Sequence, residues 1–313
     1  MNQEFDAITH LFQARTPFRH PTTSLGNGDD ASVHHIPQGM ELVVSTDIAV
    51  EDVHWPKDMS LDIAGARAVN AALSDLAAMG ATPAWIWLAI SAKDKQSLSQ
   101  MSDGIVQTCV AHNVELAGGD TVNAPINSIN VTVGGLVAKG TAMRRSAARV
   151  DDEVWVLGDL GLSAAGLKQW LSGQQDGIFV PHFQTIKPLY KQGMALRELG
   201  IQGCIDISDG LLQDLGHISK ASQVGIHIDI SLVQNLDSYQ QLQAAFSTEE
   251  TLKMMLSGGE DFALCFTAPA TKHLALIELG AKHIGFCCEG SDVQLMQDGK
   301  SIDYNIKGYD HFG

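Results

Sequence analysis

The run Glu41-Leu42-Val43-Val44-Ser45-Thr46-Asp47 is apolar at its centre and ends in polar residues, which predicts a β-strand. An alanine-rich stretch follows at residues 62–79. Its apolar residues recur at helical spacing, and Gly80 is placed to end a helix. This strand and helix begin an alternation that continues along the chain and decides the fold class.

The alternation recurs on both sides of a polar seam at residues 140–152, which contains three arginines. Before the seam we predict strands at residues 85–91, 115–120 and 129–138, and a helix at 97–113. After it we predict strands at 153–158, 204–206, 225–230, 261–267 and 283–287, and helices at 163–172, 189–200 and 208–222. Mixed strands and helices with short connections predict an α/β (α+β) protein. We expect two domains, at residues 1–145 and 146–313.

The composition excludes several classes of protein. Of the 313 residues, 45% are hydrophobic and 18% are charged, as in an ordinary globular protein of about two domains. The formal net charge of −16 argues against a nucleic-acid partner, because binding to a phosphate backbone needs a basic surface. No apolar run reaches the length of a membrane span and the first residues lack the features of a signal peptide, so we expect a cytoplasmic protein. The five cysteines are odd in number and form no C-x-x-C, which argues against a zinc knuckle or a disulfide framework.

Five acidic sites share one pattern, an aspartate beside glycine, serine or threonine. They are Gly28-Asp29-Asp30, Ser45-Thr46-Asp47, Ser74-Asp75, Gly118-Gly119-Asp120-Thr121 and Asp206-Ile207-Ser208-Asp209-Gly210. Mg²⁺ prefers oxygen ligands and is usually held by one or two carboxylates with phosphate oxygens and water. Glycines let backbone N–H groups approach phosphate. The pattern therefore indicates a metal-dependent phosphate site.

Each of these sites also has a purely structural explanation. An aspartate beside glycine is most often a turn residue. Ser208 could cap a helix while Asp209 complements the helix dipole. Asp75 lies in the small, apolar stretch 70–80, which predicts a largely buried helix, and a buried carboxylate needs a partner or a metal. No Lys or Arg lies three or four residues away from it.

Electrostatics and the missing motifs favour metals. Several aspartates facing a triphosphate would repel it unless divalent cations bridged them, so we predict a requirement for Mg²⁺ or Mn²⁺. The chain has no G-x-x-x-x-G-K-[ST], no complete G-x-G-x-x-G and no protein-kinase signature set. We therefore expect metal ions, with one arginine, to bind the phosphates and neutralise their charge.

Taken together, these segments resemble the thiamine-monophosphate kinase family, in the superfamily of aminoimidazole ribonucleotide synthetase and selenophosphate synthetase. The resemblance runs nearly end to end. Besides the acidic sites, it rests on Val53-His54-Trp55, Leu73-Ser74-Asp75-Leu76-Ala77-Ala78-Met79-Gly80-Ala81, Ser163-Ala164-Ala165-Gly166-Leu167, Ser257-Gly258-Gly259-Glu260-Asp261-Phe262 and Gly308-Tyr309-Asp310-His311-Phe312.

The resemblance implies a role for each matching position. The implied metal ligands are Asp30, Ser45, Thr46, Asp47, Asp75, Asp120, Asp206 and Asp209. The implied ATP contacts are Gly119, Asp120, Arg145 and Ser208, and the implied contacts to thiamine monophosphate are His54, Glu260 and Tyr309. The implied fold is a homodimer in which N-terminal sheets pair across the two subunits, with a C-terminal α/β domain beside each.

The chain departs from the family pattern at a few positions. Ala72 replaces the usual Asn before Leu-Ser-Asp, Ala263 replaces the acid after the Gly-Gly-Glu-Asp segment, and Asn123-Ala124 replaces Arg-Gly. Either Arg144 or Arg145 is the ATP contact, and we choose Arg145 because it precedes Ser146. None of these departures removes an implied metal ligand.

Three substrate residues keep structural alternatives. His54 could be a surface histidine at the end of a strand, and Glu260 could cap the next strand. Tyr309 lies near the terminus, where chains often fray, although a terminus rich in aromatic residues suits stacking on a thiazolium or pyrimidine ring.

The leading hypothesis is transfer of the terminal phosphoryl group of ATP to thiamine monophosphate, assisted by several Mg²⁺ ions and without an acid–base residue. A related ATP-dependent synthetase of the superfamily is the alternative enzyme. A non-catalytic regulator that binds nucleotide or divalent metal is the alternative of a different class.

Overall fold

The computed structural model describes residues 10–302 and shows a mixed α/β protein with an N-terminal sheet domain and a C-terminal α/β domain. Among the described residues, one compact unit holds residues 10–76 together with Ala81–Gly140. The other holds Ala77–Gly80 and residues 141–302. None of the helices within residues 10–302 combines the length and the apolar character needed to cross a lipid bilayer.

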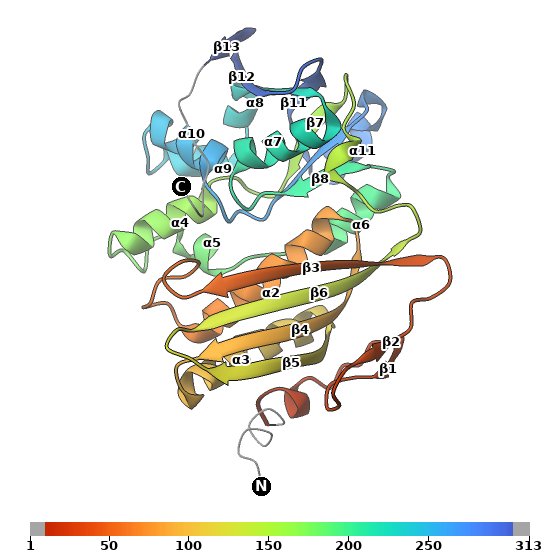
Figure 1. Ribbon diagram of the computed structural model, residues 1–313. Helices are drawn as coiled ribbons and strands as arrows, with labels where there is room; N and C mark the ends of the chain where they lie inside the picture. The colour runs from red at the N-terminus through yellow and green to blue at the C-terminus, as the bar shows by residue number, and fades with distance from the viewer. Residues whose placement is uncertain (1–9, 303–313) are drawn as a thin grey trace. The chain divides into compact units, whose positions relative to one another are not determined.

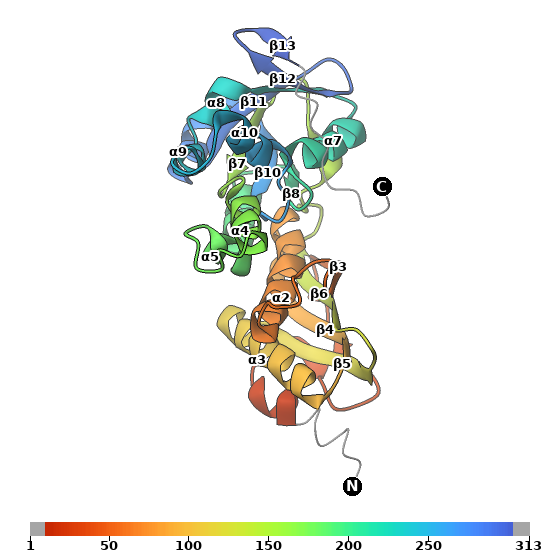
Figure 2. The same cartoon turned by 90° about the vertical axis from the view of Figure 1, so that its left-hand side faces the viewer.

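The first unit is built on a four-stranded sheet of order β3-β6-β4-β5 (Figure 1). Two long helices lie on one side of this sheet (Figure 2). A small hairpin and a short 3₁₀ helix precede the sheet. The elements are η1 (Gln13–Arg15), β1 (Thr23–Leu25), β2 (Val33–His34), β3 (Met40–Val50), α2 (Leu61–Ala78), β4 (Thr82–Ala92), α3 (Lys95–His112), β5 (Glu115–Asn123) and β6 (Ser128–Ala138).

The second unit is built on a seven-stranded mixed sheet of order β13-β12-β9-β11-β7-β10-β8, in which only β12 and β9 pair in parallel. Its strands are β7 (Glu153–Leu157), β8 (Gly203–Asp206), β9 (Gly225–Asp229), β10 (Leu264–Ala268), β11 (Lys282–Cys288), β12 (Val293–Gln297) and β13 (Lys300–Ile302). Its helices are η2 (Arg145–Ala147), α4 (Leu162–Leu171), α5 (Val180–Gln184), α6 (Tyr190–Glu198), α7 (Leu211–Ser222), α8 (Ile230–Gln234), α9 (Asp237–Gln243), α10 (Thr248–Ser257), η3 (Ala270–Lys272) and α11 (His273–Glu278).

This sheet separates two hydrophobic cores, because the side chains of a strand alternate between its faces. Val154 and Val156 of β7 belong to a core shared with α4, α7, α8, α9 and α10. Trp155 and Leu157 of the same strand belong to a core shared with α6 and α11. The second unit is therefore a sheet with helices packed on both faces.

The predicted helices and strands match observed elements, but the sequence reasoning did not predict β1, β2, β12, β13, α5, α8, α9, α10 or α11. The predicted elements differ from the observed ones mainly in their boundaries at the acidic segments. The strand predicted at 41–47 continues to Val50, so Ser45, Thr46 and Asp47 lie inside β3 and not at its end. The strand predicted at 115–120 likewise continues to Asn123. The helix predicted from 208 begins only at Leu211, and the strand predicted from 261 begins at Leu264. In each case the end of the helix or strand lies among polar residues, where the pattern of apolar residues does not define the boundary.

The two helices of the first unit touch through glycines. A Cβ at Gly104 of α3 would overlap the backbone carbonyl oxygen of Asp62 in α2, and a Cβ at Gly65 of α2 would overlap the carbonyl oxygen of Met101 in α3. This close approach needs a residue without a side chain on each helix.

We expect Gly104→Ala to lower the free energy of unfolding by about 1–3 kcal/mol, because the added methyl overpacks the α2–α3 contact. Gly216→Ala is the matched control, since Gly216 lies in helix α7 and a Cβ there would meet no atom within 4 Å. The control should be neutral or stabilising by up to about 1 kcal/mol. Urea unfolding of both variants checks this, and equal effects would contradict it.

Candidate functional site

Asp47 of β3 and Asp75 of α2 are neighbouring carboxylates in the first unit. The Ser45 hydroxyl donates a hydrogen bond to Asp75 Oδ2 over 2.5 Å. Burial, and then the charge of Asp75, raise the pKa of Asp47 to about 6. Two neighbouring carboxylates repel each other when both are ionised. A divalent cation bound between them would remove this repulsion.

The surroundings of Asp75 are partly as predicted. Its neighbours Leu73, Ser74 and Leu76 are fully buried, as the apolar stretch indicates. Asp75 itself is only half-buried and accepts the hydrogen bond from Ser45. The prediction of a largely buried helix is confirmed, but Asp75 itself is less buried than predicted because it lies on the side of α2 that meets Ser45 of β3.

Strand register separates the implied ligands of the first unit. Asp47 pairs with Val131, which pairs with Leu88, and these residues share the face of the sheet covered by α2. Thr46 and Asp120 point to the other, open face. Asp120 lies on β5, with two strands between it and β3, so strand spacing puts it about 14 Å from the Asp47 strand. Within this sheet, the structure does not bring Thr46 or Asp120 to the carboxylate pair.

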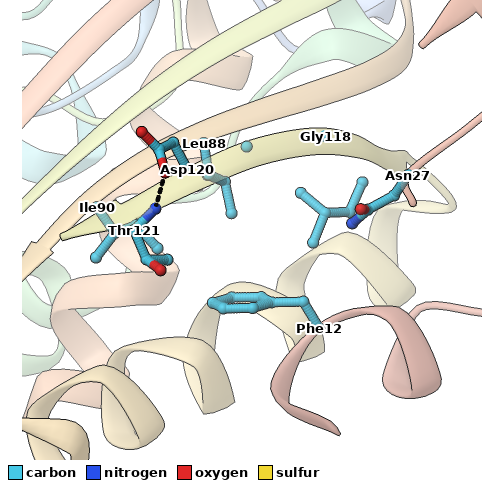
Figure 3. A pocket seen from close by; sticks show the side chains of 9 residues that line it. Phe12, Asn27, Leu88, Ile90, Gly118, Asp120 and Thr121 are labelled. Carbon is cyan, nitrogen blue, oxygen red and sulfur yellow. Dashed lines mark hydrogen bonds between the residues drawn. The ribbon is translucent and has the colours of Figure 1, made fainter. Parts of the chain in front are cut away.

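Asp120 borders a small pocket formed by β4, β5, Phe12 and the loop between β1 and β2, although its carboxylate points away from Phe12 (Figure 3). The pocket has a volume of about 30 Å³, enough for about one water molecule. Figure 3 shows Phe12 and Asn27 beside it, and Asp120 Oδ1 accepts a hydrogen bond from the Thr121 N–H over 2.8 Å. Gly119 is required by the sheet itself, because a Cβ there would lie 2.5 Å from the Leu88 carbonyl oxygen.

Asp30 belongs to an exposed loop whose flanking hairpin is tied to the sheet. The anchor is Glu115, a buried carboxylate at the start of β5. It accepts hydrogen bonds from the His20 N–H over 2.8 Å and from the Thr23 hydroxyl over 2.5 Å. The Trp85 indole N–H donates to the same Thr23 oxygen over 2.9 Å. These contacts fix the hairpin that carries the Asp30 loop.

His54 is held by the turn that follows β3. Its Nδ1 accepts a hydrogen bond from the Val50 N–H over 3.1 Å, and its own backbone N–H donates to the Val50 carbonyl oxygen over 2.9 Å. A neutral ring that accepts at Nδ1 carries its proton on Nε2. The half-buried His54 is therefore oriented with an N–H donor at Nε2.

In the second unit, the loop with Ser208 and Asp209 is held by a residue that sequence reasoning missed. Asp214 Oδ2 accepts the backbone N–H groups of Ser208, Asp209 and Gly210 over 3.1, 3.1 and 3.2 Å. Burial raises the pKa of Asp214 to about 7. The alternative in which Ser208 caps the helix is wrong, since Gly210 occupies the N-cap and makes no side-chain cap. The available signal was an acid in the first turn of the helix.

The same loop contacts the segment with Glu260. The Glu260 N–H donates to the Ser208 carbonyl oxygen over 2.8 Å, so Ser208, Asp209 and Glu260 lie together. Asp206 is buried at the end of β8, just before this loop. Gln213 Nε2 donates to Asp209 Oδ2 over 3.1 Å. Four implied site residues are thus gathered at one end of the second sheet.

Asp261 is a second carboxylate whose role the sequence did not reveal. Its Oδ2 accepts the Gly161 N–H over 2.6 Å and its Oδ1 accepts the Ser163 N–H over 3.3 Å, at the start of α4. Burial raises the pKa of Asp261 to about 8, against the opposite effect of these two donors. Sequence reasoning took Asp261 as the first residue of a strand.

The remaining implied residues are less defined. Arg144 and Arg145 are both exposed, and Arg145 lies in η2. Tyr309 lies outside the described residues. In residues 10–302, no group of three or more His, Cys, Asp and Glu side chains that could hold a metal ion is found. The first unit thus offers a carboxylate pair, which is the donor set typical of Mg²⁺ shared with phosphate.

We expect Asp261→Asn to change how stability depends on pH. Below about pH 4 the wild-type carboxyl is protonated whether the chain is folded or unfolded. Between about pH 4 and about pH 8, the unfolded chain releases this proton while the folded chain keeps it, because its folded-state pKa is raised to about 8. The wild type should therefore lose stability relative to the variant as pH rises through this window, by at most about 1.4 kcal/mol per pH unit.

Urea unfolding of both proteins between about pH 5 and pH 9 measures this effect. The difference in the free energy of unfolding should level off above about pH 8. A difference that stays constant across the range would contradict the expected titration of Asp261.

Comparison with known proteins gives one consistent result. Residues 28–137 match AIR synthase related protein, N-terminal domain, and residues 149–291 match AIR synthase related protein, C-terminal domain. The chain is 36% identical over 324 residues to thiamine-monophosphate kinase of Escherichia coli strain K12, covering 99% of this chain and 98% of that protein. It is 32% identical over 330 residues to thiamine-monophosphate kinase of Bacillus subtilis strain 168, covering 99% of each.

Solved structures agree. Thiamine-monophosphate kinase from Stenotrophomonas maltophilia K279a has a TM-score of 0.82 and 32% identity, covering 95% of this chain and 97% of that chain. A further relative, AaThiL complexed with AMPPCP and TMP, shares the fold at a TM-score of 0.78 and 24% identity, covering 99% of this chain and 96% of that chain. Since both halves match the AIR synthase related domains and identity exceeds 30% over nearly the whole length, the chain belongs to the thiamine-monophosphate kinase family.

Proposed function

We propose that this chain transfers the terminal phosphoryl group of ATP to the phosphate of thiamine monophosphate, which yields thiamine diphosphate. The observation that carries this function is 36% identity to a thiamine-monophosphate kinase over 99% of the chain. The pair Asp47 and Asp75 supports it, because Mg²⁺ bound to a nucleotide is usually held by one or two carboxylates.

The proposed metal ligands fall into two groups by domain. Asp30, Ser45, Thr46, Asp47, Asp75 and Asp120 belong to the first unit, and Asp206 and Asp209 belong to the second. Mg²⁺, when bound, neutralises the phosphate charge and orients the phosphates for in-line transfer. Ser45 Oγ and the two carboxylates around it are the donors that best fit this ion, since all are oxygen atoms held on rigid elements.

The acceptor needs no strong general base. A phosphate monoester is largely ionised at neutral pH, so its oxygen can attack without prior proton removal. The chain's part is to place the acceptor. We assign this to Nε2–H of His54, to Glu260 and to Tyr309. ATP would be bound by Gly119, Asp120, Ser208 and Arg145, with Arg144 as the alternative arginine.

We further propose a homodimer formed through the N-terminal sheets. β3 is an edge strand, and no other strand of residues 10–302 pairs along its outer side. Leu42, Val44 and Ile48 on its open face are 46%, 54% and 54% exposed. A long edge strand with exposed apolar side chains is an association surface, and a second copy of the same sheet offers a matching one.

The direct test of the proposed function uses purified protein with ATP, Mg²⁺ and thiamine monophosphate. We expect thiamine diphosphate and ADP as products and loss of turnover on chelation of the metal. No turnover would overturn the proposal. Turnover only with a purine-pathway intermediate would favour the related synthetase, and nucleotide binding without any turnover would favour a regulator.

Asp75→Asn should lower kcat/KM by about 100-fold or more, since losing even a residue that only supports a metal ligand typically costs 10–100-fold. The matched control is Asp62→Asn, an exposed acid in the first turn of the same helix. Activity titrated with Mg²⁺ and circular dichroism of both variants check this. An Asp75→Asn protein with wild-type turnover would remove Asp75 from the metal site.

Val44→Lys should convert the dimer to a monomer of 33.5 kDa, because the substitution places a charge in the apolar face of β3. Val110→Lys is the control, since Val110 is 48% exposed on α3. Light scattering after size-exclusion chromatography gives the mass. A Val44→Lys protein that remains dimeric would place the interface elsewhere.

A further inference from the structure

The segment around Asp261 has an uncommon backbone. Glu260 has φ of 64° and Phe262 has φ of 49°, so both flanking residues are in the left-handed region. Residues with a side chain rarely adopt this region, and a bulky one such as Phe does so only when its surroundings enforce it. The surroundings of this segment must therefore supply the constraint.

Hydrogen bonds on both sides of Asp261 supply part of this constraint. The Glu260 N–H donates to the Ser208 carbonyl oxygen and the Phe262 N–H to the Ile207 carbonyl oxygen, each over 2.8 Å. Phe262 is 7% exposed. A Cβ at Gly259 would lie 2.5 Å from the Ser208 carbonyl oxygen, so the segment runs against the Ser208 loop with no room between them.

The Asp261 carboxylate supplies the rest from the opposite direction. It accepts the N–H groups of Gly161 and Ser163 over 2.6 and 3.3 Å, at the N-terminus of α4. Oxygen acceptors are favourable there because the first N–H groups of a helix have no partner within the helix. The segment is thus fixed between α4 and the Ser208 loop, with its two left-handed residues at the points of attachment.

From this geometry we propose that Asp261 is a positioning residue for thiamine monophosphate: its attachment to α4 holds Glu260 in the left-handed conformation that presents the Glu260 carboxylate to the acceptor. The inference rests on the proposed function, in which Glu260 contacts the acceptor. We assign Asp261 itself no contact with either substrate.

A merely structural role predicts something different. If Asp261 only stabilised α4, its removal would lower thermal stability and would affect both substrates alike. If Asp261 acts through Glu260, its removal should weaken the binding of thiamine monophosphate and leave the binding of ATP unchanged. Replacing Asp261 should also have no further effect on the KM for thiamine monophosphate once Glu260 has lost its charge, because both residues act through the same interaction.

The test is a double-mutant cycle with Asp261→Ala, Glu260→Gln and the double variant. We expect each single variant to raise the KM for thiamine monophosphate by about tenfold, as for loss of one hydrogen bond to a charged group. The KM for ATP should stay within about twofold, and the double variant should be no worse than Glu260→Gln. Asp176→Asn, an exposed acid of the same domain, is the control expected to behave as wild type.

Asp261→Asn covers the case in which Asp261→Ala does not fold. It keeps one oxygen acceptor, so it should fold and show a smaller, equally selective rise in KM. Effects that multiply in the double variant, or equal changes for ATP, would overturn the positioning role. Wild-type protein without turnover would instead overturn the proposed function, and the positioning role with it.

Discussion

The burial of aspartate side chains, to which repulsion between neighbouring acids adds, is the constraint on which the rest of this structure depends. The chain carries a formal charge of −16, and its implied functional residues are mostly aspartates. At a partly buried position, two carboxylates about 4 Å apart repel by about 4 kcal/mol. Each acidic cluster must therefore obtain compensation from hydroxyl or N–H donors, from protonation or from a cation.

The aspartates described above fall into two groups, according to which groups offset the cost of burying them. Asp214 and Asp261 accept backbone N–H groups from loops and from a helix start, and they hold those segments in place. Asp47 of β3 and Asp75 of α2 are neighbours, and burial, followed by the charge of Asp75, raises the pKa of Asp47. The first kind holds backbone segments in place, whereas the second kind supports the proposed binding of a divalent cation with phosphate.

The strained backbone on either side of Asp261 can be compared with the hydrogen bonds that this residue accepts. A residue in a sparsely populated backbone region costs about 1–3 kcal/mol, and Glu260 and Phe262 are two such residues separated only by Asp261. A typical intramolecular hydrogen bond contributes about 0.5–1.5 kcal/mol. The two bonds accepted by Asp261 together contribute about 1–3 kcal/mol, which is comparable to the strain of one of these residues. Strain of this kind persists at sites where one conformation is needed.

The sequence by itself determined the order of the main helices and strands, the acidic segments and the family, because periodicity and local motifs are properties of neighbouring residues. The helix predicted at 62–79 is α2 (Leu61–Ala78), and the strand predicted at 153–158 is β7 (Glu153–Leu157). Only the tertiary structure decided that Ser45 and Asp47 face α2 while Thr46 faces the open side, since a shift of one residue in a strand reverses its faces. It also decided that Asp214 and Asp261 hold loops, because their partners are backbone N–H groups that no side-chain pattern records.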